Sequence, residues 1–401
     1  MNALKADVYK QDTLAGHFFR TPHTTEFRYS ADYLDSHHAP VATTLPLTDE
    51  PFVYQAGALP PFFTGLLPEG RRLTSLRNVL KVSKDDELSL LLAVGADTVG
   101  DVRVLPPGVV PDNEYAEPIT EFDPTQLASI SFADFFSAQG LLDYAALPGV
   151  QDKVSGKMLT IPLRHNHNFY LLKLTPPEYP LLVENEHFFL EYARRISFRN
   201  GVVSSHLVRD ITGRSGLLIQ RFDRGIDGNG HLARYAVEDA CQLLNLYPAD
   251  KYEVTALRLA QAVVEKTSQP ILVAQELVRQ FAFAWLTGNG DLHAKNISII
   301  ESSGKYRLAP VYDIPSTAPY GDQSMALKLL GKERGLSAKT FLDFGQELGV
   351  RPAATTLLLR KMLHETEELV EGATGLPFDS ARRKQLVKIL KNRRLSLSAG
   401  L

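Results

Sequence analysis

Three polar side chains in the C-terminal half of the chain have a spacing that suits phosphoryl transfer. Asp291 and Asn296 lie five residues apart in a glycine-containing segment, 287–296, and Asp313 follows a little later. Phosphoryl transfer needs a carboxylate that faces the attacking hydroxyl, and oxygen ligands that hold Mg²⁺ against the nucleotide phosphates. We therefore predict Asp291 as the catalytic residue and Asn296 and Asp313 as metal ligands. Taken alone, an Asp and an Asn in such a loop are also typical of ordinary turns.

The elements around this loop favour the catalytic interpretation. An apolar helix is predicted before it, because Leu277, Phe281 and Ala284 recur on one helical face. Glycines end that helix, and two strands are predicted at 297–300 and 306–311 around a Ser-Ser-Gly turn. A hairpin of this kind would bring the acidic residue that follows it back beside the loop. The layout is that of protein kinases.

A lysine upstream meets a second requirement of this chemistry. Lys173 is the one cation in a strongly apolar strand predicted over 169–174, and a buried lysine needs an anion. The phosphates of a nucleotide would supply it. Glu186, at the start of a helix predicted over 186–196, is the expected carboxylate partner of Lys173 in a structural ion pair. The alternative is that Lys173 lies on an edge strand and extends its amine to solvent.

Further nucleotide contacts are expected on both sides of this strand. A loop that could cover the phosphates precedes it and consists of Gly149, Val150, Gln151, Asp152 and Lys153. It matches neither G-x-G-x-x-G nor Walker A, so an ordinary turn remains open. Backbone groups of Gln220, Arg221 and Phe222, at the end of a strand predicted over 217–223, could contact the adenine.

Two further residues of the polar loop are candidate catalytic groups. His293 orients the loop by hydrogen bonding or, alternatively, takes part in proton transfer. Lys295 could neutralise charge on the transferred phosphoryl group. Other chemistries find little support, because the chain has no H-E-x-x-H, no G-x-S-x-G and no C-x-x-C sequence.

Composition indicates an ordinary globular protein. The 401 residues carry a net charge of −3, which gives no general attraction to nucleic acid or membrane. The single cysteine, Cys241, excludes an intrachain disulfide and is expected to be buried. Neither a membrane-spanning run nor a basic, then apolar, N-terminus is present, so we expect a cytoplasmic protein without membrane contact. The basic segment 382–394 is expected to be the solvated face of a last helix.

The pattern of elements divides the chain into three parts. Residues 1–108 are predicted as a small α+β module, 125–235 as a mixed helix and strand region, and 236–401 as a mostly helical region with one hairpin. The acidic, proline-containing stretch between 112 and 124 is typical of a linker.

Together these residues resemble the HipA-like toxin kinases of bacterial type II toxin–antitoxin pairs. The motifs that carry the resemblance are 65–69, 95–100, 149–153, 172–174, 220–224, 291–296 and 312–314. The resemblance implies an α+β, two-lobed protein-kinase-like fold in which 1–108 precedes an N-lobe and a C-lobe. It implies an ATP- and Mg²⁺-dependent serine/threonine kinase, and it extends the nucleotide contacts to Asp223.

The resemblance also implies partners. In the family the substrate is an aminoacyl-tRNA synthetase, whose phosphorylation arrests translation and favours growth arrest and persistence. A small, HipB-like antitoxin binds the toxin and DNA, so that the kinase reaches DNA only indirectly. One departure is that Ala146 occupies the position of a serine that many relatives autophosphorylate. Two alternatives remain: a small-molecule phosphotransferase of the aminoglycoside or choline kinase type, and a catalytically silent, antitoxin-binding scaffold.

Overall fold

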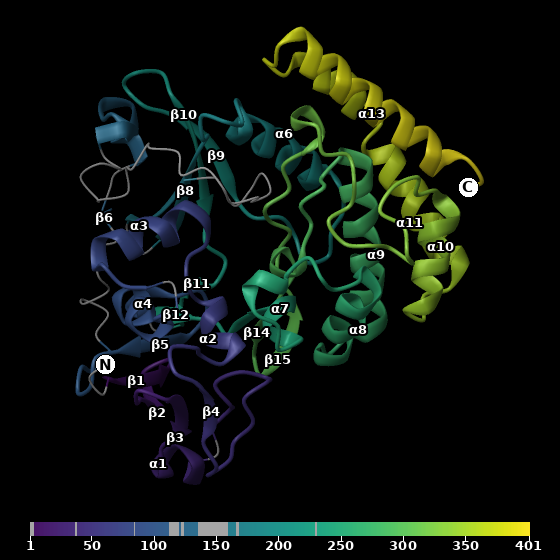
Figure 1. Ribbon diagram of the computed structural model, residues 1–401. Helices are drawn as coiled ribbons and strands as arrows, with labels where there is room; N and C mark the ends of the chain where they lie inside the picture. Colours follow the sequence, from purple (N-terminus) through teal and green to yellow (C-terminus); the bar gives the residue numbers. More distant parts are fainter. Residues whose placement is uncertain are drawn as a thin grey trace.

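The computed structural model describes residues 4–36, 38–83, 85–111, 120–121, 124–134, 159–165, 168–228 and 231–401. It contains two five-stranded sheets, two smaller sheets and a helical C-terminal part (Figure 1). The purple N-terminal strands and the yellow helix α13 lie at opposite sides of the molecule in Figure 1. The predicted loop 149–153 and Ala146 lie outside the described residues. Over the ranges given above, no helix has both the length and the apolar character needed to cross a bilayer.

The N-terminal part is an antiparallel sheet with strand order β4-β3-β2-β1-β5, covered by short helices. Strand β3 alternates between buried and more exposed side chains, so that Phe27 and Tyr29 enter a core with Phe18 and Phe63. Its elements are β1 (Leu4–Lys10), β2 (Thr13–Arg20), β3 (Thr24–Tyr29), α1 (Ala31–Asp35), β4 (Phe52–Gln55), α2 (Pro61–Gly65), α3 (Gly70–Leu80), α4 (Glu87–Val94) and β5 (Val102–Leu105).

The central sheet has strand order β6-β7-β8-β10-β9, with helix α6 packed against β9 and β10. The helix begins four residues before the predicted start, which places Glu186 in its second turn. The elements are β6 (Thr120–Glu121), β7 (Leu159–His165), β8 (Asn168–Leu174), α6 (Leu182–Arg195), β9 (Ser205–Arg209) and β10 (Ser215–Gln220), followed by the two-stranded sheet β11 (Arg224–Ile226) and β12 (Leu232–Arg234).

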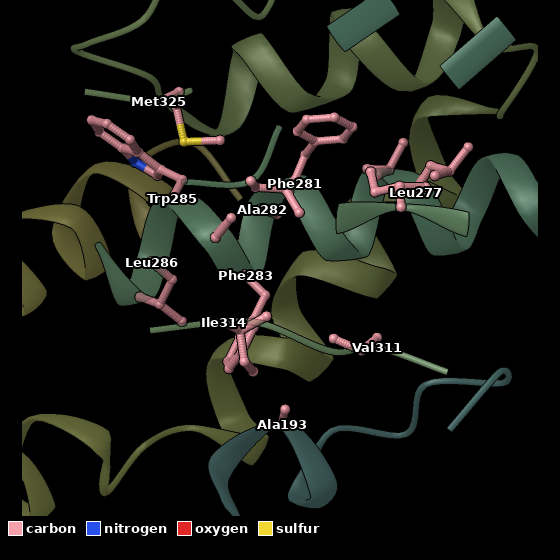
Figure 2. Close-up of a cluster of buried hydrophobic side chains, with 14 of the residues drawn as sticks. Ala193, Leu277, Phe281, Ala282, Phe283, Trp285, Leu286, Val311, Ile314 and Met325 are labelled. Atoms are coloured by element: carbon pink, nitrogen blue, oxygen red, sulfur yellow. The ribbon is translucent and has the colours of Figure 1, made fainter. Parts of the chain in front are cut away.

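The C-terminal part is built around α9, which is buried along almost its whole length. Figure 2 shows Leu277, Phe281 and Trp285 along this helix, with Phe283 pointing toward Ile314. The buried Cys241 belongs to the same core, as predicted. The elements are β13 (Val237–Asp239), α7 (Ala240–Leu243), α8 (Ala256–Lys266), α9 (Pro270–Thr287), β14 (Ser298–Ser302), β15 (Lys305–Leu308), α10 (Ala338–Glu347), α11 (Pro352–Glu365), α12 (Leu369–Gly372) and α13 (Ser380–Ser398).

The last helix differs from its prediction at one residue. Most of the basic side chains of α13 are exposed or half-buried, but Arg393 is only 5% exposed. Its guanidinium lies 4.0 Å from the centre of the Trp285 ring and donates to the Trp285 carbonyl at 2.7 Å. The solvated-face prediction is therefore wrong for Arg393, because an arginine can stack on an aromatic ring and satisfy a helix carbonyl at once.

Candidate active site

Two adjoining cavities lie where the N-terminal part, the central sheet and the C-terminal part meet. The strand-end cavity, of about 210 Å³, includes Lys173, Gln220, Phe222 and Asp313 among its lining residues. The loop cavity, of about 290 Å³, includes Lys173, Asn296 and Asp313. Because Lys173 and Asp313 line both, the two cavities meet at this pair.

Lys173 joins two carboxylates at this meeting point. Its Nζ lies 2.8 Å from Glu186 Oε1 and 2.7 Å from Asp313 Oδ1. All three groups are inside the protein, and Glu186 is fully buried. Burial raises the pKa of Glu186, although the charge of Lys173 opposes this shift. Burial would lower the pKa of Lys173, but the charges of Asp313 and Glu186 are the stronger effect and raise it. The ammonium group is therefore charged, and it faces an excess of negative charge.

The backbone around Asp313 is held in an unusual conformation. Asp313 has φ = 54°, in the left-handed region that non-glycine residues rarely adopt. Val311 and Ile314 on either side are buried in the large core that also contains α9 (Figure 2). These apolar anchors offset the cost of the conformation, which is on the order of 1 kcal/mol or more. The hairpin β14–β15 thus delivers one carboxylate to Lys173.

The loop after α9 depends on two glycines. Gly288 ends the helix with φ = 74°, and its amide bonds to the helix carbonyls. Gly290 has no room for a side chain, because a Cβ there would lie 2.5 Å from Thr317 Oγ1. Further along, Asn296 Nδ2 donates to the Asp291 carbonyl at 2.8 Å, which leaves the amide oxygen of Asn296 for other partners. This hydrogen bond joins the two ends of the segment 291–296.

Asp291 is not among the residues that line these two cavities. Its side chain is fully buried, and its Oδ1 accepts a hydrogen bond from Tyr252 Oη at 2.8 Å. The Tyr252 ring packs edge-on against His293, with 5.0 Å between ring centres. Burial lowers the pKa of His293, which favours its neutral form, and within the described part of the chain its Nδ1 has no hydrogen-bond partner. His293 itself lines the loop cavity.

Lys295 has partners that its sequence prediction does not include. Its Nζ lies 3.0 Å from Glu69 Oε1 and 3.5 Å from Asp239 Oδ2, and it donates to the Gly65 carbonyl at 3.0 Å. Glu69 also pairs with Lys251. Although burial opposes ionisation, Lys295 and Lys251 lower the pKa of Glu69 to about 2. The N-terminal part thereby places the Glu69 carboxylate in contact with Lys295 of the loop.

The end of β10 offers one amide to a ligand in the strand-end cavity. The amides of Gln220 and Arg221 are engaged, since they donate to Ser204 O at 2.9 Å and Phe169 O at 2.8 Å. The Phe222 amide, by contrast, donates to no acceptor among the described residues. Of the three residues predicted to contact the adenine through their backbone, Phe222 is therefore the one whose amide is available as a donor.

The side chains of Arg221 and Asp223 turn away toward the N-terminal part. Arg221 pairs with Asp97 at 2.7 Å and with Asp223 at 2.8 Å, and Asp223 accepts from the Gly100 amide at 2.8 Å. Asp97 also pairs with Arg224 and Arg234. Burial would raise the pKa of Asp97, but these arginines hold it at about 2. Both residues, predicted to bind the nucleotide, nevertheless line the strand-end cavity.

This buried network makes a clear stability prediction. Asp97→Asn would leave three nearly buried guanidinium groups without their shared carboxylate, so we expect the free energy of unfolding to fall by about 3–5 kcal/mol. Urea unfolding followed by circular dichroism measures the change. Asp343→Asn, in an exposed pair with Lys339, is the control and should stay within about 0.5 kcal/mol of wild type. Equal stability of the two variants would contradict the prediction.

Three residues at the site were not predicted from the sequence to act there. Tyr252 comes from the segment before α8, and Glu69 and Arg72 come from the N-terminal part. No periodicity or spacing links them to the loop, because they are brought there by tertiary packing. The motif around Glu69 contributes only to the family resemblance.

The fold and the site define a two-lobed, kinase-like protein with an additional N-terminal part. A family model for the HipA-like C-terminal domain matches residues 145–370, and one for the HipA N-terminal domain matches residues 6–105. The chain belongs to the HipA-like family and is a HipA-like kinase.

Solved and curated relatives agree with this assignment. The structure of HipA from Shewanella oneidensis MR-1, in a complex with HipB and operator DNA, superposes with a TM-score of 0.75 at 21% identity, covering 98% of this chain and 97% of that one. This match confirms the predicted α+β, two-lobed protein-kinase-like fold. The serine/threonine-protein kinase toxin HipA of S. oneidensis is 27% identical over 356 residues, 81% of this chain and 78% of the relative. Protein Y4dM of Sinorhizobium fredii is 33% identical over 288 residues, 67% and 65% of the two chains.

Proposed function

We propose that this HipA-like kinase transfers the γ-phosphate of ATP to a serine or threonine hydroxyl of a protein. The observation that carries the proposal is Lys173, held between Glu186 and Asp313 at the point where the two cavities meet. The ammonium group bonds both carboxylates where the cavities meet, and a nucleotide bound there with Mg²⁺ would bring its phosphates beside this charge.

The donor set around the loop cavity suits Mg²⁺. Asn296 presents its amide oxygen, because its nitrogen is bonded to Asp291, and Asp313 keeps Oδ2 beside the oxygen that pairs with Lys173. Hard oxygen donors of this kind are the ligands that Mg²⁺ prefers. When bound, the ion would neutralise charge on the phosphates. We assign Asn296 and Asp313 to holding the metal, Lys173 to the α- and β-phosphates, and the Phe222 amide to the adenine.

Asp291 is the group that we assign to the acceptor hydroxyl. Its carboxylate would accept the hydroxyl proton or orient the oxygen for attack on the terminal phosphorus. Tyr252 fixes one carboxylate oxygen of Asp291 by its 2.8 Å hydrogen bond and so orients the group. Burial of Asp291 keeps water away from this group.

A change at Tyr252 tests this arrangement. We expect Tyr252→Phe to lower kcat about tenfold and to leave the KM for ATP unchanged, because a hydrogen bond to a charged carboxylate contributes about 1.5–3 kcal/mol. Steady-state kinetics with labelled ATP measure both constants. Tyr247→Phe, which loses only a bond to the Leu59 carbonyl of the N-terminal part, is the matched control. A rise in KM with kcat unchanged would assign Tyr252 to substrate binding instead.

We further propose that the chain is the toxin of a type II toxin–antitoxin pair. The supporting observation is the likeness to a HipA whose solved complex contains HipB and operator DNA. The partner would be a small DNA-binding, HipB-like antitoxin through which the kinase reaches DNA. The protein substrate would be an aminoacyl-tRNA synthetase, whose phosphorylation arrests translation and growth and favours persistence.

Labelling with γ-³²P-ATP tests the proposed activity. Purified protein, Mg²⁺ and ATP are incubated with a whole-cell protein extract or with a panel of small alcohols, with and without EDTA. We expect label in one or a few proteins, on serine or threonine, and none with EDTA. Label in small molecules alone would establish the small-molecule phosphotransferase. No transfer, combined with growth arrest that survives Asp291→Asn, would establish the scaffold.

A further inference from the structure

Arg72 is a cation at the active site that the roles assigned above do not use. It lies on α3 of the N-terminal part, and it lines the loop cavity with Lys173, Asn296 and Asp313. It is half-buried, yet among the residues that the structure describes its guanidinium has neither a hydrogen bond nor an ion pair. A partly desolvated charge without a partner is costly, so a ligand that supplies an anion would be favoured here.

The helix that carries Arg72 is fixed to both lobes. Glu69, directly before α3, pairs with Lys251 and Lys295 of the C-terminal part. Arg71 pairs with Glu178, which precedes α6 of the central region. Because two residues just before Arg72 are anchored, the start of α3 is held beside the cavity that Arg72 lines.

The remaining cations of the loop cavity already have carboxylate partners. Lys173 has Glu186 and Asp313, Lys251 has Glu69, and Lys295 has both Glu69 and Asp239, whereas Arg72 forms no ion pair with any residue in the described part of the chain. Burial and the charge of Arg221 lower the pKa of Arg72, while Asp97 opposes them. Burial thus disfavours the charged guanidinium, and the neighbouring charge of Arg221 adds to this effect.

The order of the two cavities indicates which anion Arg72 meets. The strand-end cavity contains the Phe222 segment, the two cavities meet at Lys173, and the loop cavity lies beyond. A nucleotide with its base at Phe222 and its inner phosphates at Lys173 would project its terminal phosphate into the loop cavity. We propose that Arg72 binds this terminal phosphate and stabilises its charge during transfer, an inference that rests on the kinase function proposed above.

The proposal makes the N-terminal part a contributor to catalysis. A guanidinium can bond two phosphate oxygens at once, and arginines that contact a transferred phosphoryl group have large effects on its transfer. Arg72 would act together with Lys173 but from a different part of the chain. It would also distinguish a triphosphate from a diphosphate, because ADP lacks the group that Arg72 contacts.

Nucleotide binding by the full chain tests the proposal. Titration calorimetry with Mg²⁺ compares ADP with the non-hydrolysable ATP analogue that has an imido group between its β- and γ-phosphorus atoms. We expect Arg72→Ala to weaken binding of the analogue about tenfold, to leave ADP binding unchanged, and to lower kcat roughly a hundredfold. Arg72→Lys should retain part of the affinity and of kcat, since lysine keeps the positive charge but lacks the paired N–H donors of the guanidinium. Arg77→Ala, on the same helix but outside the lining of both cavities, is the matched control.

The outcomes separate this inference from the function on which it rests. If the wild-type chain binds neither nucleotide, the proposed kinase function fails. If it binds both and Arg72→Ala changes them by the same factor, or changes neither, the role of Arg72 is overturned while the kinase function stands. Unchanged ADP affinity in Arg72→Ala also shows that the variant is folded.

Discussion

Asp291→Asn is expected to reduce kcat by at least roughly a hundredfold, equivalent to about 3 kcal/mol of transition-state stabilisation. The amide keeps the shape of the side chain, so the hydrogen bond from Tyr252 can persist while the group that attracts the acceptor proton is lost. Because Asp291 does not line the cavity shared by Lys173 and Asp313, Mg²⁺-nucleotide affinity should change little. Single-turnover transfer and calorimetry measure the two quantities.

The exposed carboxylate Asp343 again provides the comparison, since Asp343→Asn should transfer phosphate at the wild-type rate. In cells, expression of Asp291→Asn should no longer arrest growth if the chain acts by phosphorylation. Phosphoproteomics after controlled expression of wild type and Asp291→Asn would then identify the substrate. Retained transfer by the purified Asp291→Asn protein would remove Asp291 from the mechanism.

Lys173→Met is expected to affect both stability and activity. Removal of the ammonium group leaves Glu186 and Asp313 close together without their cation, so we expect the free energy of unfolding to fall by about 3–5 kcal/mol. In the proposed mechanism it also removes a contact with the phosphates, and kcat/KM should fall at least roughly a hundredfold. Urea unfolding and steady-state kinetics measure these effects on the same preparations.

A double variant separates the two effects of Lys173. Lys173→Met combined with Glu186→Gln neutralises the fully buried carboxylate, so a substantial part of the lost stability should return. Activity should not return, since neither new side chain can bind phosphate. Recovery of both properties would mean that Lys173 serves the fold alone.

The sequence was informative where a local pattern determines the structure. The apolar period around Phe281 predicted the buried helix α9, and the turn after Ile300 predicted the hairpin that delivers Asp313. Lys173 was recognisable because a charge inside an apolar strand requires a partner. These features depend on residues close together in the chain, so periodicity and turn chemistry suffice to find them.

The interface between the N-terminal part and the lobes could not be derived in this way. Arg221 and Asp97 are 124 residues apart, and no local rule brings them together. The motifs around Glu69 and Asp97 contributed to the family resemblance, but their physical role is to contact the C-terminal part and the end of β10 respectively. For the same reason the sequence did not show that the charges of Arg221 and Asp223, two positions predicted to contact the nucleotide, are balanced by pairs with each other and with Asp97.

The contacts of the N-terminal part have a mechanical consequence. Asp97 pairs with Arg221 and Arg224 at the strand-end cavity, whereas Glu69 pairs with Lys251 and Lys295 at the loop cavity. The N-terminal part is therefore joined by ion pairs both to the end of β10 and to the C-terminal part. A large separation of the two lobes would have to break either the ion pairs of Asp97 or the ion pairs that Glu69 forms with Lys251 and Lys295. If the chain is the kinase proposed above, exchange of ADP for ATP should accordingly require only small local displacements, and the two lobes should stay close together throughout the reaction cycle.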